Sequence, residues 1–246
     1  MGAVENLQKK YGSSQDQSGV HQHASSPNID VQLAWHQMSH LYVSQVHEGW
    51  WDQMPMGQSI AVLQPFKHAH LSLVEHLDQL FKIEKLGDYE DLRVDIAELG
   101  LLAFQDWLGV AQQLGLMMLS VPLSMEIDGK LKLQYTESFG AFAQNITEYA
   151  TEDAFQQFYQ CITYKRLRLI LESSSEQLLR ESSFQAWALI SLILPKGITQ
   201  RVHLTIPSEW VAEIQELRNR FTGNEALQSI KELMPVIASR LVQNRS

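Results

Sequence analysis

The chain has few of the residues that mark the most recognisable functional sites. It contains 1 cysteine, Cys161, among 246 residues, which excludes an internal disulfide and a cysteine-ligated zinc or iron–sulfur centre within one chain. Cys161 lies in an apolar helical pattern, so we expect a buried structural thiol. A lone cysteine is typical of a reducing compartment, and residues 1–17 hold no apolar segment of the kind that a secretory signal carries. The sequence therefore predicts a cytoplasmic protein.

Local catalytic and nucleotide-binding motifs are also missing. The sequence contains no GxGxxG and no GxxxxGK[ST], so nothing in it supports a dinucleotide or phosphate-loop site. GxSxG, SxxK and HExxH are absent as well, and these motifs mark several classes of hydrolase. We therefore expect no cofactor and favour a protein that is not an enzyme. Because catalytic groups often converge from distant positions, this absence lowers the odds of an enzyme without excluding one.

Long apolar runs and dense positive charge are scarce too. The longest apolar run lies near Ala188–Leu194, far short of the roughly 20 residues that a membrane-spanning helix needs. The net charge is −9, and residues 1–123 carry 14 acids against 6 bases. Such a surface repels phosphate backbones, and the short cluster of Lys165, Arg166 and Arg168 is typical of a solvated helix face. We expect neither nucleic-acid binding nor membrane insertion.

What the sequence does contain is helical periodicity. In Asp91–Leu114, seven apolar residues recur at spacings of three and four, which predicts one central helix that ends at Gly115. The same spacing predicts a helix from Ser208 to Phe221 and a last helix over about 225–242. Residues 1–28 are poor in aliphatic side chains, so we expect a disordered or loosely held N-terminal arm.

Two segments in the C-terminal half predict β-hairpins. Alternating residues flank Asp128–Gly129, which predicts strands at 117–127 and 130–136 with Pro122 as a split or an edge. Apolar 184–194 and alternating 200–206 predict a second pair. The predicted fold class is therefore α+β, predominantly helical, with two hairpins that can pair into one small antiparallel sheet. We expect a single domain over 29–246, with a helical layer at 29–115 and a hairpin-plus-helix part at 116–246.

Three histidines on the first predicted helix, Val31–Glu48, form a candidate metal site. His36, His40 and His47 stand at i, i+4 and i+11, which places them along one line of a continuous helix. Two histidines at i, i+4 can share a metal, although a half-buried face with packed histidines explains the same pattern. Glu75 and His76 could contribute from the next helix, but no repeated Glu-x-x-His motif of a dimetal bundle is present.

Two aromatic residues and one apolar stripe are candidates for partner binding. Trp50 and Trp51 are adjacent, so both cannot face one core from a helix, and one of them could mark a contact surface. The stripe of the last helix could pack on its own domain or dock a partner; it comprises Leu227, Ile230, Met234, Ile237 and Leu241.

The sequence thus favours a non-enzymatic interaction module, such as an adaptor, a chaperone or an accessory subunit of a larger assembly. Its partner would be another protein or a second copy of the chain. The first alternative is a metal-dependent enzyme or metal sensor that uses the histidine line. The second is an apolar small-molecule binder with a pocket between its elements, which only the overall composition supports.

Overall fold

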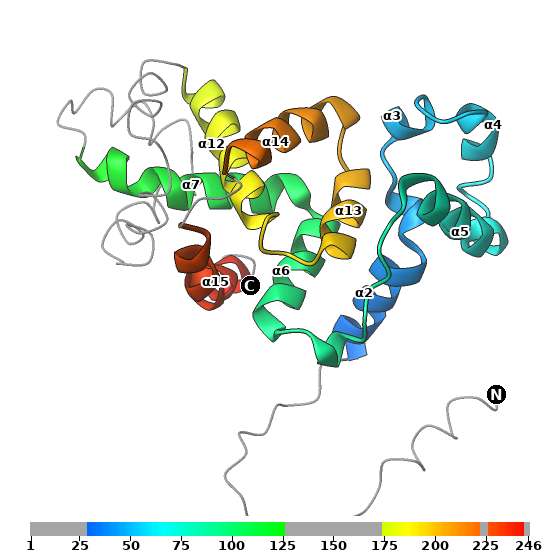
Figure 1. The fold of residues 1–246 in the computed structure, drawn as a ribbon, viewed down its shortest axis with the longest axis horizontal. Coiled ribbons are helices and arrows are strands. Elements are labelled where there is room, and N and C mark those ends of the chain that lie inside the picture. The colour runs from blue at the N-terminus through cyan, green and yellow to red at the C-terminus, as the bar shows by residue number, and fades with distance from the viewer. Residues whose placement is uncertain (1–28, 126–173, 222–225, 244–246) are drawn as a thin grey trace, which may run out of the picture.

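The computed structural model describes residues 29–125, 174–221 and 226–243, and within these ranges it holds helices and no strand (Figure 1). The described part is therefore all-α, and the predicted α+β class is wrong. The N-terminal arm expected at 1–28, the turn at Asp128–Gly129, the strand predicted at 130–136 and Cys161 lie outside the described residues.

The α-helices are α2 (Ile29–His40), α3 (Glu48–Trp51), α4 (Gly57–Ala61), α5 (His70–Phe81), α6 (Val94–Gln105), α7 (Trp107–Met125), α12 (Ser175–Ile190), α13 (Lys196–Leu204), α14 (Ser208–Phe221) and α15 (Ala226–Gln243). The 3₁₀ turns are η1 (Tyr42–Gln45), η2 (Lys67–Ala69) and η3 (Tyr89–Asp91).

The predicted central helix is two helices rather than one. Asp106 leaves the helical region of backbone space, with φ −150° and ψ 75°, and separates α6 from α7. Its carboxylate accepts a hydrogen bond from the backbone N–H of Gly109 at 3.0 Å, which caps the first turn of α7. Gly115 does not end a helix: it lies in the middle of α7.

The strand predicted at 117–127 is the second half of α7, as far as residue 125. Leu116, Met117, Met118 and Leu119 are each at most 1% exposed, so this turn of the helix is covered on every side. A helix enclosed all round presents an unbroken apolar run, which its period cannot distinguish from a buried strand. Pro122 lies within α7 rather than at a strand edge.

The second predicted hairpin is α12 followed by α13. Its first apolar run, from Phe184 to Ile190, is again enclosed on all sides. The alternating segment 200–206 was predicted as a strand for another reason. Arg201 and His203 were expected on a solvent face, but they are as buried as their apolar neighbours Val202 and Leu204. Because the polar residues have internal hydrogen-bond partners, polarity did not report exposure here.

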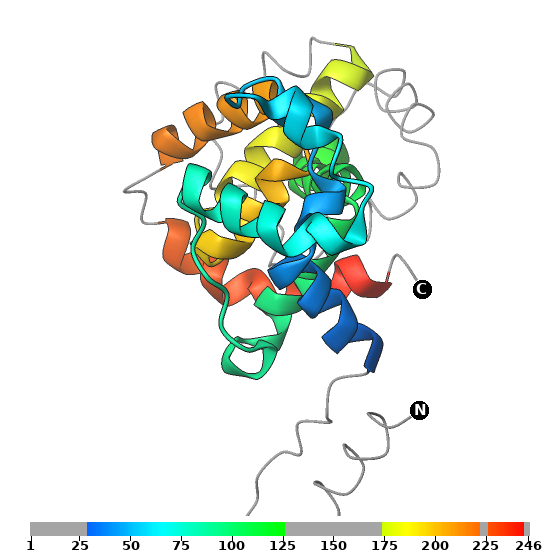
Figure 2. The same cartoon turned by 90° about the vertical axis from the view of Figure 1, so that its right-hand side faces the viewer.

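The helices form two parts that meet across a shared core. In Figure 1, α7 crosses α12, α14 lies beside α12 and above α7, α15 lies below α7, and α6 descends through the middle. The helices α2 to α5 stand together on one side; Figure 2 shows them in front of the remaining helices. We call residues 29–86 the N-terminal layer. Buried residues from Trp35 to Leu241 belong to one hydrophobic cluster that includes both parts.

The N-terminal layer is irregular because its first helix stops early. The helix predicted over Val31–Glu48 is α2, which ends at His40, then η1, and then the short α3. His47 is the N-cap of α3 and accepts a hydrogen bond from the N–H of Gly49 through Nδ1 at 3.1 Å. The N–H of His47 itself donates to the carbonyl oxygen of Leu204 at 2.8 Å, which joins the layer to α13.

Across the described ranges, none of the helices is long and apolar enough to cross a membrane.

Candidate interaction surface and a polar cavity

Four exposed apolar side chains of the N-terminal layer lie in one short segment. Residues 56–66, which we call the α4 corner, run from the residue before α4 to the residue before η2. Figure 1 places α4 at the outer edge of the layer, on the side away from α7 and α15. Its large apolar residues are unusually exposed: Met56 77%, Val62 66%, Phe66 48% and Leu63 44%. Exposed apolar side chains that cluster in this way mark contact surfaces more often than scattered ones do.

A tight turn fixes the start of the α4 corner. Met56 adopts the left-handed conformation, with φ 57°, which is uncommon for a non-glycine residue. Gly57 then passes directly over α3, where an added Cβ would lie 1.7 Å from the carbonyl oxygen of Trp51. Only glycine fits this approach, so the geometry of the turn depends on Gly57.

Hydrogen bonds hold the other end of the corner to the core. The side-chain amide of Gln64 donates to the carbonyl oxygen of Val43 at 2.9 Å. The carbonyl oxygen of Gln64 in turn pairs with Nε2 of the buried His70 at 2.7 Å. The amide of Gln58 also donates to the carboxylate of Asp52. The exposed apolar side chains thus belong to a segment that hydrogen bonds hold to the core. Such preorganisation reduces the conformational entropy lost on binding.

The two tryptophans predicted as contact residues have other positions. Trp51 is 2% exposed and belongs to the core. Trp50 is half-buried, and its indole N–H donates to the carbonyl oxygens of His203 and Ile206 at 3.2 and 2.9 Å. Its ring also meets Phe81 edge-on, with centroids 5.5 Å apart. Trp50 therefore joins the layer to α13 and the segment that follows it, Trp51 is a core residue, and a role of either in partner binding stays a prediction.

The stripe of the last helix faces inward. Ile230, Met234, Ile237 and Leu241 are fully buried, and α15 packs on α6 and α7. The side chain of Leu227 lies outside the described residues. A partner could reach this stripe only if α15 left the core, so the intramolecular reading of the pattern fits the structure better.

The three histidines do not form one line, because the helix that would align them ends at His40. His36 and His40 remain neighbours on α2, with ring centroids 5.0 Å apart, whereas His47 caps α3. In the part of the chain that the structure describes, no group of three or more histidine, cysteine, aspartate or glutamate side chains is placed to hold a metal ion. Metal binding by His36 and His40 stays a prediction without a third described ligand.

A second feature of the layer is a partly open cavity of about 250 Å³ between α2, α5 and α13. Its deepest charged group is the guanidinium of Arg201, which is 2% exposed. Nη1 of Arg201 donates to the carbonyl oxygens of Glu84 and Gly197 at 2.6 and 3.0 Å. Nη2 lies 3.9 Å from Oδ1 of Asp78, and the guanidinium carbon stands 5.3 Å from the ring centroid of Tyr42.

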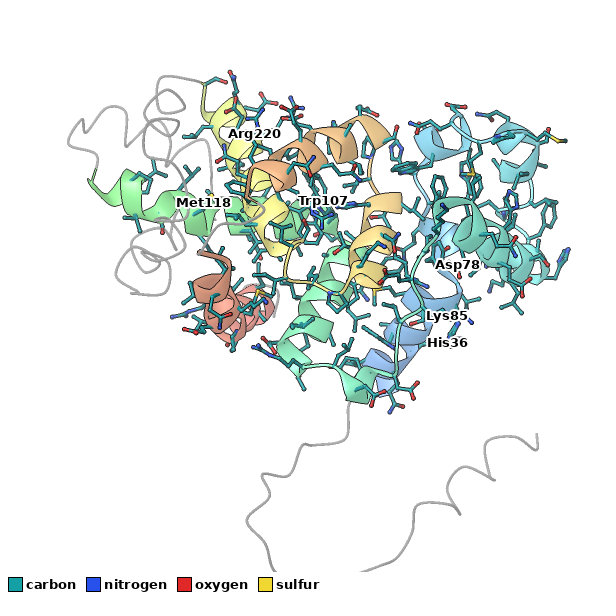
Figure 3. The ribbon with its side chains drawn as sticks, in the orientation of Figure 1. His36, Asp78, Lys85, Trp107, Met118 and Arg220 are labelled. Carbon is teal, nitrogen blue, oxygen red and sulfur yellow. The ribbon has the colours of Figure 1, made fainter. Side chains whose placement is uncertain are left out.

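The electrostatics of this cavity follow from its burial. Loss of water raises the pKa of the Tyr42 hydroxyl, which also donates a hydrogen bond to Asp78 at 2.7 Å. Burial lowers the pKa of the Arg201 guanidinium, and the negative charge of Asp78 opposes that shift. The pKa of His40 is lowered by burial and then by His36 and Arg201, with Asp78 acting in the opposite direction. In Figure 3, Asp78 and Lys85 lie on the side of the molecule where α5 faces α2.

Sequence reasoning missed both features for physical reasons. No local pattern in the α4 corner shows which of its apolar residues stay exposed. Arg201 was expected on the solvent face of a strand, and no short-range signal marks a buried arginine.

Comparison of the chain with protein-family models, with curated proteins and with solved structures returned no match.

Proposed function

We propose that the protein is a non-enzymatic interaction module, such as an adaptor, a chaperone or an accessory subunit of a larger assembly, and that it binds its partner through the α4 corner. The observation that carries the proposal is the exposure of Met56, Val62 and Phe66 on a backbone fastened to the core. Apolar anchors on a rigid segment are the usual energetic centre of a protein interface. The cytoplasmic location expected from the single cysteine belongs to the same proposal.

Charge indicates the kind of partner. Residues 29–125 carry 12 acids and 4 bases, a net charge of −8 with neutral histidines. Asp52, next to the corner, and Glu48 on α3 are both exposed. A partner surface with apolar side chains surrounded by lysine or arginine would complement this part of the protein. Charges at the rim of an interface mainly raise the association rate, so we expect association to slow as salt rises.

The test is native mass spectrometry of the full chain isolated gently from its own cells. Wild-type protein should carry a stoichiometric partner, and a Val62→Ser/Phe66→Ser double variant should lose it. Two anchors typically contribute about 2 kcal/mol or more each, so the double variant should bind more than a hundredfold more weakly. A matched control, Val94→Ser/Leu108→Ser, changes two comparably exposed apolar residues on α6 and α7 and should retain the partner.

Two outcomes would contradict the proposal. One is a partner that stays bound to the corner variant but leaves the control variant. The other is a wild-type chain that carries no protein partner under conditions that preserve known complexes. If the partner mass equals that of the chain itself, the module self-associates, and the same pair of variants then tests whether the dimer uses the α4 corner.

A further inference from the structure

Two exposed histidines lie side by side at the C-terminal end of α2. His36, labelled in Figure 3, and His40 are separated by about one helical turn, which places their side chains on the same face of the helix. Their ring centroids are 5.0 Å apart, and the ring planes are inclined by 49°. Imidazole is the commonest protein ligand of metal ions, so two rings this close are a candidate chelating pair.

The separation of the two rings matches a shared metal ion. A zinc or copper ion bonds an imidazole nitrogen at about 2.0 Å and so lies about 3.2 Å from the ring centroid. If two rings bind one ion at an angle of about 90–110°, their centroids lie about 4.5–5.2 Å apart. The separation of 5.0 Å between His36 and His40 falls in this range. Rotation of the two side chains can therefore bring one nitrogen of each ring to the same ion while the helix stays in place.

Neither ring of the pair is committed to another group. Nδ1 of His47, Nε2 of His70 and Nε2 of His203 each take part in a hydrogen bond. By contrast, the rings of His36 and His40 have no hydrogen bond and no ion pair with any residue that the structure describes. A metal ion can therefore bind both rings without breaking an internal hydrogen bond.

The helix that carries the pair is anchored on its buried side. Trp35 is 7% exposed and Met38 is fully buried. The indole N–H of Trp35 donates to the carbonyl oxygen of Gly87 at 3.2 Å, and the backbone N–H of Leu41 donates to the carbonyl oxygen of Gln37 at 2.9 Å, which closes the last turn. Ligands fixed on a packed helix lose less conformational entropy when they bind an ion.

The charged side chains beside the pair balance one another. His40 lines the cavity between α2, α5 and α13 together with Arg201 and Lys85, which are positive, and Asp78 and Glu75, which are negative. These charges give a cation little net attraction or repulsion, so the imidazole nitrogens determine which ion binds. Imidazole favours Cu²⁺, Ni²⁺ and Zn²⁺, whereas Mg²⁺ and Ca²⁺ prefer oxygen ligands.

We propose that His36 and His40 chelate one divalent transition-metal ion, with Cu²⁺ bound more tightly than Ni²⁺ or Zn²⁺. The two imidazoles fill two coordination positions, and water or a group from another molecule fills the others. His47, which the sequence placed on the same line, takes no part because it caps α3. The pair lies on α2, outside the α4 corner, and does not depend on the proposed function.

The first experiment is isothermal titration of the untagged full chain with CuCl₂, NiCl₂, ZnCl₂ and MgCl₂. The sequence also contains His21 and His23, two residues apart, so the titration uses a His21→Gln/His23→Gln background that removes this second pair of ligands. One equivalent of Cu²⁺ should bind, more tightly than Ni²⁺ or Zn²⁺, and Mg²⁺ should not bind. The electron paramagnetic resonance spectrum of the copper complex should show coupling to two nitrogens. No binding of Cu²⁺ at up to ~1 mM, or coupling to a single nitrogen, would overturn the proposal.

Variants in the same background then locate the site. His36→Gln and His40→Gln, both at exposed positions, should each weaken Cu²⁺ binding at least about tenfold, because the second imidazole no longer acts at a high effective concentration. Each variant should also reduce the coupling to one nitrogen. The matched control, His68→Gln/His76→Gln, removes two other exposed histidines of the N-terminal layer and should bind Cu²⁺ as the background does. Unchanged affinity in either single variant, or an equal loss in the control, would assign the metal elsewhere and sink the proposed site.

Discussion

His203 is a histidine that the fold keeps uncharged. It is 6% exposed, and its Nε2 accepts a hydrogen bond from the indole N–H of Trp187 at 3.4 Å. Burial, with a smaller contribution from the charge of Arg218, lowers the pKa of His203 to about 3. In the unfolded chain its pKa is about 6.5. Between these two values the unfolded state binds one more proton, so this residue makes stability fall as the pH drops below about 6.5.

We therefore predict that acid destabilises the protein partly through His203. The contribution of this residue should be up to about 1.4 kcal/mol per pH unit below pH 6.5. Urea unfolding between about pH 7 and pH 4.5 measures the slope, and His203→Gln, which keeps an acceptor but cannot titrate, should flatten it. His76→Gln, at an exposed position, is the control and should leave the slope unchanged. A wild-type slope in the His203→Gln variant would show that other groups account for the acid sensitivity.

Gly57 is a second residue whose role can be isolated. An added Cβ would meet the carbonyl oxygen of Trp51 at 1.7 Å, so Gly57→Ala must displace either α3 or the α4 corner. We expect a loss of about 1–3 kcal/mol in the free energy of unfolding, together with weaker partner binding. Gly87→Ala is the matched control, because its Cβ would meet only Asp91 at 3.8 Å. Equal stability of the two variants in chemical denaturation would contradict this account of the turn.

At the scale of elements, the crossing of α7 and α12 depends on Gly115. A Cβ at this position would lie 2.7 Å from the backbone nitrogen of Ser183 and 2.9 Å from Oγ of Ser182. Alanine favours a helix over glycine by up to about 1 kcal/mol, so a free helix would gain from the exchange. Here the two backbones would have to separate, and enclosed residues on both helices would lose contacts.

We predict that Gly115→Ala lowers the free energy of unfolding by about 1–3 kcal/mol despite the better helix propensity. The measurement is thermal or urea unfolding of the full chain. Gln112→Ala, on the same helix at a half-buried position, is the control and should change stability by less. A Gly115→Ala variant more stable than wild type would mean that α7 and α12 do not approach closely at this residue.

The helices that the sequence predicted correctly are amphipathic ones, with one side exposed to solvent. The helix expected over 208–221 is α14, and the last helix, expected over about 225–242, is α15 at Ala226–Gln243. Both keep a polar face in water, so their period of three and four is legible. The failures are the enclosed second halves of α7 and α12, together with α13. An enclosed helix loses its period, and in α13 the buried Arg201 and His203 even imitated the alternation of a strand.

At the scale of the whole molecule, the polar cavity and the α4 corner were out of reach of the sequence because they are assembled from distant segments. The cavity between α2, α5 and α13 combines Ser39, Asp78 and Arg201, which lie on three different helices. In the α4 corner, Gln64 is hydrogen-bonded to Val43 and the nearby Trp51 is buried, while Met56, Val62, Leu63 and Phe66 are exposed. Local pattern identifies elements, but the sites depend on how those elements pack.

The expectation of a single domain leads to one more prediction. The six tryptophans divide evenly: Trp35, Trp50 and Trp51 lie in the N-terminal layer, and Trp107, Trp187 and Trp210 lie in the other part. Because one hydrophobic cluster includes both parts, the layer and the rest should unfold together. Tryptophan fluorescence and far-ultraviolet circular dichroism should then give coincident urea curves.

The junction between the two parts sharpens this test. Trp50→Phe keeps the ring against Phe81 but removes the hydrogen bonds to the carbonyl oxygens of His203 and Ile206. In one cooperative unit, this loss of about 1–3 kcal/mol must lower both curves by the same amount, because neither part is folded while the other is unfolded. If both curves split into two steps and Trp50→Phe shifted only one of them, residues 29–86 would form a domain of their own. The α4 corner would then belong to a unit able to bind a partner without α6 to α15.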